Sequence, residues 1–198
     1  MSELVLASAS AVRASVLKNA GIPFHIEPAS IDEEAIKTNL MGQGRQPREI
    51  ADALAEAKAL DVSRANPDAL VLGADQILVF ENGCISKSSS LADARTVLLR
   101  LRGNLHRLIS ALVLAQNGEP VWRHLETATL WMREFSDAFL DTYLADEGQS
   151  LLGGVGCYRL EGRGSQLFTR IEGDYFAILG LSLLPLLSAL RERGVVPK

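Results

Sequence analysis

Charged and hydroxyl side chains that could bind phosphate and metal recur along the first half of the chain. Serine hydroxyls and cationic side chains receive negative phosphate oxygens, whereas carboxylates hold hard divalent cations. A polyphosphate hydrolase needs both kinds of group, because catalysis at phosphorus depends chiefly on positioning and charge neutralisation. The candidate phosphate ligands are Ser8, Ser10, Arg13, Lys58 and Lys87, and the candidate metal ligands are Glu33 and Asp75.

The stretch VLASASAVRASVLKNAG, residues 5–21, predicts a buried strand, a tight turn and a helix. Ser10 is a good N-cap, and Gly21 follows the helical pattern as a stop. Arg13 then falls in the first helical turn, where the exposed N–H groups already carry partial positive charge. Its side chain is therefore either solvated or directed at an anion, which Ser8 and its small neighbours would let approach the backbone.

Asp75 stands in the middle of ALVLGADQILVF, residues 69–80, an apolar stretch that predicts a buried strand. A carboxylate in that setting is costly unless it is paired or bound to metal. Gly73 and Ala74 beside it clear room for something to approach. A structural carboxylate that accepts hydrogen bonds from backbone N–H groups fits the sequence equally well.

Lys58, Lys87 and Glu33 each allow two interpretations. Lys58 lies at the edge of the apolar stripe of a predicted helix, so its ammonium either snorkels to water or points into a cleft. Lys87, taken alone, is typical of a solvated loop lysine. Glu33 belongs to an acidic run typical of a solvated loop, although a carboxylate opposite Asp75 could hold a divalent cation.

The composition is that of a soluble globular protein. The chain has 198 residues, of which 47% are hydrophobic and 22% charged, and a net charge of −4 argues against a broad nucleic-acid surface. The most apolar stretch, residues 180–190, is too short to span a bilayer. No secretory signal is visible, so we expect a cytoplasmic protein. The two cysteines form no metal-binding spacing.

Strands and helices alternate along the chain, but the predicted long hairpin argues against a purely parallel sheet. We therefore expect an α/β fold with a mixed sheet flanked by helices. No repeat or linker marks a boundary, so one domain is expected over residues 1–198. Further helices are predicted at 46–66, 88–103, 135–148 and 182–194, and further strands at 23–35, 105–115, 121–132 and 165–173, with a glycine-rich loop at 153–164.

Six segments in this order resemble the Maf family of nucleoside triphosphate pyrophosphatases, across essentially the whole chain. LASASAVR is similar to the family's LASxSPRR opening, and the acidic pair at 32–33, EAKA at 56–59 and GADQ at 73–76 follow its pattern. Lys87 is similar to the lysine of the GKP element. LEGRG and RIEGDYFAILGLSL are similar to the closing elements. Generic P-loop, GxGxxG, GxSxG and HExxH motifs are absent from the sequence.

The resemblance implies two lobes with a twisted mixed sheet and a cleft between them, and hydrolysis of a nucleoside triphosphate to monophosphate and pyrophosphate with Mg²⁺ or Mn²⁺. It implies Asp75 as the catalytic aspartate and Glu33 with Asp75 as metal ligands. It also implies that Ser8, Arg13, Lys58 and Lys87 bind the triphosphate. Such enzymes are often dimeric, which makes a homodimer an expectation, whereas neither nucleic acid nor membrane is expected as a partner.

Three further residues correspond to family positions that decide the preferred base: Val12, Gln76 and Glu161. The dTTP and UTP group carries Arg, Thr and Gln there, and the 7-methyl-GTP group carries Trp, Gln and Glu. This chain follows the second group at two of the three. A carboxylate can accept hydrogen bonds from guanine N1–H and its amine, so we expect a preference for a modified purine triphosphate. The alternative function is a nucleotide-binding regulator of cell division that needs no turnover.

One of the departures from the family pattern concerns the loop that carries Lys87; the others are Ala11 and Val12 in the opening motif and the lost asparagine within FAILG. The proline that follows this lysine in the family is Ser88 here, and the loss of a proline is expected to loosen the loop. Because the lysine itself remains, we expect lower efficiency rather than loss of activity.

Overall fold

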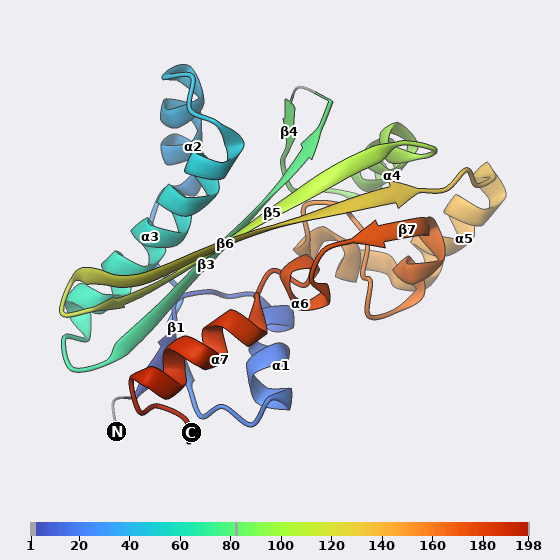
Figure 1. The fold of residues 1–198 in the computed structure, drawn as a ribbon. Helices are drawn as coiled ribbons and strands as arrows, with labels where there is room; N and C mark the ends of the chain where they lie inside the picture. The colour runs from blue at the N-terminus through green and yellow to red at the C-terminus, as the bar shows by residue number, and fades with distance from the viewer. Residues whose placement is uncertain (1–2, 82, 198) are drawn as a thin grey trace. The chain divides into compact units, whose positions relative to one another are not determined.

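A computed structural model describes residues 3–81 and 83–197 of the chain (Figure 1). These residues form seven strands and seven α-helices, and the strands join in one mixed sheet. The predicted α/β class with a mixed sheet flanked by helices is confirmed. No helix among the described residues has the length and apolar character needed to cross a membrane.

The strands follow the order β2-β1-β3-β5-β6-β7, with β4 paired to β3. β1 is parallel to β2 and β3, whereas β4 and β7 are antiparallel to β3 and β6, so the sheet is mixed. The strands are β1 (Leu4–Leu6), β2 (His25–Ile26), β3 (Leu70–Phe80), β4 (Gly83–Ile85), β5 (Leu105–Gln116), β6 (Glu119–Met132) and β7 (Phe168–Glu172).

Most helices begin at a side chain that accepts a hydrogen bond from the first turn, as Ser10, Ser90 and Ser136 do. The helices are α1 (Ala11–Asn19), α2 (Glu33–Gly42), α3 (Pro47–Ala65), α4 (Leu91–Leu101), α5 (Asp137–Glu147), α6 (Tyr175–Ile178) and α7 (Leu183–Glu192). Two short 3₁₀ helices, η1 (Gly148–Gly153) and η2 (Arg163–Leu167), precede β7.

The chain divides into two compact units, each built from separate segments. Unit 1 comprises residues 1–76, 109–126 and 174–198, and unit 2 comprises residues 77–108 and 127–173. The long strands β3, β5 and β6 contribute residues to both units. The single domain was expected because the sequence shows no boundary, and the cleft was expected from the resemblance. Both stay predictions.

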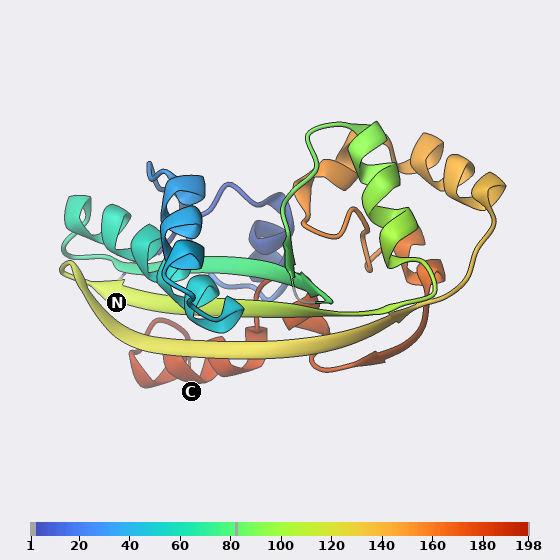
Figure 2. The same cartoon turned by 90° about the horizontal axis from the view of Figure 1, so that it is seen from above.

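Unit 1 has helices on both faces of its part of the sheet (Figure 2). One face packs α1 and α7 against β1, β3 and β5 through a core that includes Leu6, Leu72 and Leu186. On the other face, Val62 of α3 packs with Val5 and residues near it. Because alternate residues of a strand point to opposite faces, each strand residue of unit 1 is assigned to one of these two layers.

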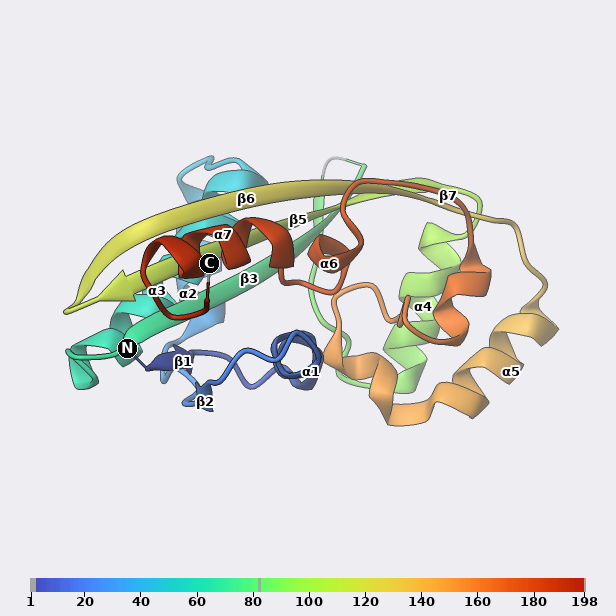
Figure 3. The same cartoon turned by 60° about the horizontal axis from the view of Figure 1, so that its bottom comes forward.

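Unit 2 contains β4, β7, α4 and α5. Helices α4 and α5 lie side by side, and both contact η1 (Figure 3). Fully buried leucines fill this unit, among them Leu98 of α4, Leu140 of α5 and Leu151 of η1. The glycine-rich loop predicted over 153–164 lies between η1 and η2.

The predicted hairpin is confirmed at its turn. Asn117 and Gly118 join β5 to β6, and both have positive φ, as a two-residue hairpin turn with right-handed strand twist requires. The prediction for residues 23–35 was wrong in one respect, because the acidic cluster begins helix α2, with the Asp32 side chain as its cap. Helix α6 and strand β4 were not predicted.

Candidate active site

The candidate site of unit 1 begins where β1 ends and β3 continues. β1 pairs with β3 as far as Leu6 and Leu72, and one further backbone hydrogen bond joins Ala7 N–H to Leu72 O. The chain then turns away into α1, so the next residues of β3 no longer have β1 as a neighbour. The carbonyl of Ala74 accepts a hydrogen bond from Arg13 Nη1 at 3.0 Å instead.

The two serines of the turn have separate tasks. Ser10 Oγ accepts from Arg13 N–H at 3.4 Å and caps α1. The buried Ser8 Oγ accepts from Arg13 Nη1 at 2.9 Å and from Ser10 N–H at 3.3 Å, so both of its lone pairs are used. The Ser8 hydroxyl hydrogen is then the group that remains for an incoming acceptor such as a phosphate oxygen.

Arg13 is held in place rather than simply solvated. Besides its contacts with Ser8 and Ala74, its Nε donates to the carbonyl of Gly180 at 2.9 Å. Burial lowers the pKa of Arg13, and the negative charges of Asp75 and Glu33 oppose that shift. Nη2 makes no hydrogen bond to any described residue, so this nitrogen can receive an anion without breaking the existing contacts.

Lys58 joins the two candidate metal ligands. Its Nζ lies 2.7 Å from Asp75 Oδ1 and 2.6 Å from Glu33 Oε2. The Lys58 side chain is buried and does not snorkel to water, and Asp75 takes an ammonium as its partner. Glu33 is about half exposed, but its contact with Lys58 excludes a purely solvated acidic loop. The structure thus brings together three residues that are 17 or more positions apart.

Gly73 explains how Lys58 reaches Asp75. A Cβ at this position would lie 2.1 Å from the carbonyl oxygen of Ala55 and 2.7 Å from the backbone nitrogen of Ala59. Helix α3 therefore packs directly against the backbone of β3. The room that Gly73 leaves is therefore filled by α3, and this close packing brings Lys58 of the helix to Asp75.

The donor set of Glu33 and Asp75 fits a divalent cation of the Mg²⁺ type. Both carboxylates face one ammonium, so their oxygens converge within unit 1. Among the described residues, no group of three or more His, Cys, Asp or Glu is arranged to hold a metal. Magnesium commonly takes one or two carboxylates and completes its octahedron with substrate phosphates and water. Two carboxylates are then a sufficient protein contribution.

Val12 and Gln76, predicted to read the base, lie in unit 1. Val12 is half-buried in the first turn of α1, beside Arg13. Gln76 follows Asp75 in β3 and therefore points to the opposite face of the sheet. Its Nε2 lies 2.9 Å from Ser110 Oγ, 3.0 Å from Ala177 O and 3.1 Å from Ile178 O. Ser110 was not identified from the sequence, since a serine in an apolar strand carries no signal of its own.

Lys87 and Glu161 belong to unit 2. Lys87 lies between β4 and α4, and the next residue, Ser88, is buried with its Oγ 3.1 Å from Cys157 Sγ. This side-chain contact joins the loop to Cys157, and the expectation that serine in place of proline loosens the loop stays a prediction. Glu161 Oε1 lies 3.1 Å from Arg159 Nε, so its carboxylate already has a cationic partner.

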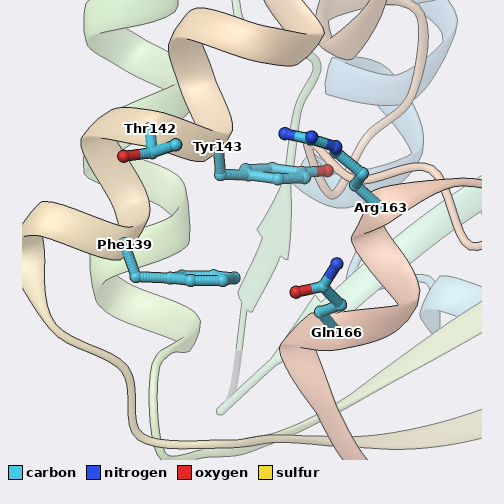
Figure 4. Close-up of a pocket in the computed structure, with 5 residues that line it drawn as sticks. All are labelled: Phe139, Thr142, Tyr143, Arg163 and Gln166. Carbon is cyan, nitrogen blue, oxygen red and sulfur yellow. The ribbon is translucent and has the colours of Figure 1, made fainter.

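A small pocket in unit 2 is lined by none of the predicted site residues. It has a volume of about 40 Å³ and is lined by Phe139, Thr142, Tyr143, Arg163 and Gln166 (Figure 4). The Phe139 and Tyr143 rings are stacked with their planes 5° apart. Pockets that hold drug-sized ligands have volumes of about 300–1,000 Å³, so this pocket is too small for a nucleotide.

The comparisons with known proteins give the family and several named relatives. The family described as "Maf-like protein" matches residues 3–193. A protein of Granulibacter bethesdensis named nucleoside triphosphate pyrophosphatase is 51% identical over 190 residues, 96% of each chain. One of Caulobacter vibrioides with the same name is 50% identical over 99% of this chain and 98% of its own. One of Rhizobium meliloti named 7-methyl-GTP pyrophosphatase is 50% identical over 98% of this chain and 97% of its own.

Proposed function

This chain belongs to the Maf family, and from that premise we propose that it is a nucleoside triphosphate pyrophosphatase. It hydrolyses a nucleoside triphosphate to the monophosphate and pyrophosphate, as a cytoplasmic enzyme that maintains the nucleotide pool. The observation that carries the proposal is the cluster of Ser8, Arg13, Lys58, Glu33 and Asp75 within unit 1. Groups that can donate hydrogen bonds to phosphate are close there to carboxylates that can hold a cation.

The triphosphate binds at the start of α1. The helix N-terminus, the Ser8 hydroxyl and the Arg13 guanidinium can all receive negative oxygens at this end. Because Ser8, Ala74 and Gly180 hold the guanidinium in advance, little conformational entropy is lost when phosphate binds. From the resemblance to the family, we further propose Lys87, in the loop before α4, as a phosphate-binding cation.

The reaction is attack of water on the α-phosphorus. The water oxygen bonds to phosphorus, the bond from that phosphorus to the bridging oxygen breaks, and pyrophosphate leaves with the bond electrons. Asp75 orients the water and accepts its proton, or holds the metal beside it. Glu33 with Asp75 would hold a divalent cation, which would neutralise charge on the phosphate oxygens when bound. Lys58 keeps both carboxylates at one place.

The preferred substrate is a purine triphosphate with a modified base, such as 7-methyl-GTP. Glu161 supports this assignment, because its carboxylate can accept the N1–H and amine hydrogens of guanine and attracts a cationic 7-methyl base. A pyrimidine offers no matching pair of donors. The half-buried Val12 adds no charge but cannot stack on a base, so discrimination is weaker than an indole would give.

Product analysis tests the proposed chemistry. The purified protein is incubated with a nucleotide panel and Mg²⁺ in water labelled with oxygen-18, and the products are separated by anion exchange. We expect monophosphate and pyrophosphate, with the label in the monophosphate. Label in pyrophosphate would place the attack at the β-phosphorus and overturn this mechanism. Diphosphate and phosphate as products would refute the proposed activity. Binding of nucleotides without turnover would favour a regulator of cell division.

A further inference from the structure

Gln76 and Ser110 converge on the last turn of α6. Gln76 Nε2 faces Ser110 Oγ and the carbonyls of Ala177 and Ile178, all within 3.1 Å. The fully buried Ser110 hydroxyl donates in turn to Ala177 O at 2.7 Å. An amide nitrogen has only two hydrogens, so these acceptors share the whole donor capacity of the Gln76 side chain.

The same turn determines where the Gly180 carbonyl lies. Gly180 N–H donates to Ala177 O at 2.9 Å, which makes this one oxygen a common acceptor for Gly180, Ser110 and Gln76. Helix α6 has four residues, so no following helical turn supplies N–H groups that could donate hydrogen bonds to its last carbonyls. These carbonyls need donors from other parts of the chain. Side chains from β3 and β5 supply those donors.

Gly180 in turn holds Arg13. Its carbonyl accepts from Arg13 Nε at 2.9 Å, and its φ of +83° is one that other residues adopt only with strain. A Cβ at Gly180 would lie 3.2 Å from Arg13 Nε, so the guanidinium lies close against this turn. A shift of the turn would therefore move the guanidinium.

We infer that Gln76 and Ser110 are positioning residues for Arg13, acting through the end of α6 and the Gly180 carbonyl. The inference rests on the proposed function only for the identity of the anion that Arg13 binds. It assigns Gln76 a part in binding phosphate that does not depend on the base. Loss of either side chain weakens binding of any polyphosphate that uses Arg13.

This assignment differs measurably from base reading by Gln76. A residue that touches the base changes the ratio of kcat/KM values between nucleotides, and it has no effect on a ligand without a base. A residue that positions Arg13 changes the affinity for inorganic tripolyphosphate, and its effect disappears when Arg13 is removed.

The first measurement needs no ligand. Hydrogen exchange of the Arg13 Nε–H is followed by proton–nitrogen NMR in the unsubstituted protein, Ser110→Ala, the nearly isosteric Ser110→Cys, and Gln76→Met. We expect exchange about five- to tenfold faster in Ser110→Ala and Gln76→Met, because each effect corresponds to the loss of roughly one hydrogen bond. A smaller change is expected in Ser110→Cys. The matched control is Ser63→Ala, which removes a buried hydroxyl that accepts from Gly118 N–H elsewhere in unit 1.

The second measurement is calorimetric titration with inorganic tripolyphosphate and Mg²⁺. We expect about five- to tenfold weaker binding in Ser110→Ala and Gln76→Met, unchanged binding in Ser63→Ala, and no added effect of Ser110→Ala in an Arg13→Ala background. Unchanged Arg13 exchange, or effects that add fully to those of Arg13→Ala, would overturn the inference. Faster exchange in a protein that neither binds tripolyphosphate nor hydrolyses nucleotides would support the positioning role and refute the proposed function.

Discussion

Lys58 Nζ lies 2.7 Å from Asp75 Oδ1, and both residues are more than nine-tenths buried. Removing two charges from water is expensive, and their attraction offsets that expense only when the geometry is good and further partners are present. Here Glu33 is the further partner, at 2.6 Å from the same ammonium. A net charge of −1 therefore remains on the three groups. Such an arrangement stabilises the fold weakly and attracts a cation. It is therefore more typical of a functional site than of a structural core.

Asp75→Asn should abolish turnover. The amide keeps the shape and can still accept from Lys58, but it can neither take a proton nor carry the charge that holds a metal. Stability should fall by about 1 to 3 kcal/mol, because Lys58 loses its buried counter-charge and keeps only Glu33. Turnover with 7-methyl-GTP and GTP and unfolding by urea measure the two effects.

The control for Asp75→Asn is Asp61→Asn, which alters a partly exposed carboxylate in unit 1 that accepts from Ser30 N–H. This variant should keep normal turnover. Near-normal turnover of Asp75→Asn would make Asp75 a structural residue and contradict the mechanism.

Gly73→Ala should cost both stability and activity. The added methyl would stand 2.1 Å from the Ala55 carbonyl, so α3 must move away from β3 and take Lys58 from Asp75. Overpacking of this kind costs about 1 to 3 kcal/mol. Thermal unfolding and kcat/KM are compared with those of Gly42→Ala, where a Cβ meets nothing within 4 Å. If Gly73→Ala lost stability but kept full activity, close packing of α3 would not be what positions the site.

Local physics accounts for much of what could be predicted. The Ser10 cap, the Asn117-Gly118 turn and the apolar strand around Asp75 each follow from a few neighbouring residues. The pairing of Lys58 with Asp75 does not, because a helical period defines a face but not the element it packs against. Gly73 carried that information, but a glycine in a strand equally indicates a bulge or room for a ligand.

The contacts of Arg13 show the same limit. Its place in the first turn of a helix indicated an unusual environment, but one of the partners that fix it is the carbonyl of Gly180, 167 residues away. Helix α6, which presents that carbonyl, has only four residues and leaves no periodic signal. Contacts between distant backbone groups and side chains cannot be read from spacing, so the role of Ser110 became visible only in three dimensions.

Ser88→Ala should raise KM several-fold with little change in kcat. The substitution removes the contact of Ser88 Oγ with Cys157 Sγ at 3.1 Å, which anchors the segment that carries Lys87. Burial raises the pKa of Cys157, so its sulfur is a neutral thiol at pH 7 and the contact does not depend on charge. Steady-state kinetics are compared with those of the exposed Ser89→Ala, whose hydroxyl bonds only Asp93 among the described residues. Equal KM values in the two variants would show that the anchor does not affect Lys87.

Acid should destabilise the protein through His106. Burial lowers the pKa of this residue from 6.5 to about 4. Between these two pH values the His106 side chain is protonated in the unfolded chain and neutral in the folded protein. The free energy of unfolding therefore falls as the pH drops from about 6.5 to 4, by up to about 3 kcal/mol from this group. Urea unfolding across this range measures the slope, and His106→Phe should flatten it. An unchanged slope in His106→Phe would assign the acid sensitivity to other groups.

Glu161→Gln should reduce the preference for 7-methyl-GTP. The neutral amide loses its attraction for a cationic methylated base and replaces one of two acceptors with a donor, so the paired contact with guanine N1–H and amine is broken. Because Arg159 Nε already lies 3.1 Å from Glu161 Oε1, the carboxylate is partly neutralised, and we expect a loss of about five- to tenfold rather than more. The measurement is kcat/KM for 7-methyl-GTP, GTP, dTTP and UTP at one Mg²⁺ concentration. The control is Glu172→Gln, since Glu172 is likewise paired with an arginine two residues away in unit 2. A clear preference of the unsubstituted protein for dTTP or UTP would contradict the assignment, because neither pyrimidine presents the two donors that a carboxylate reads.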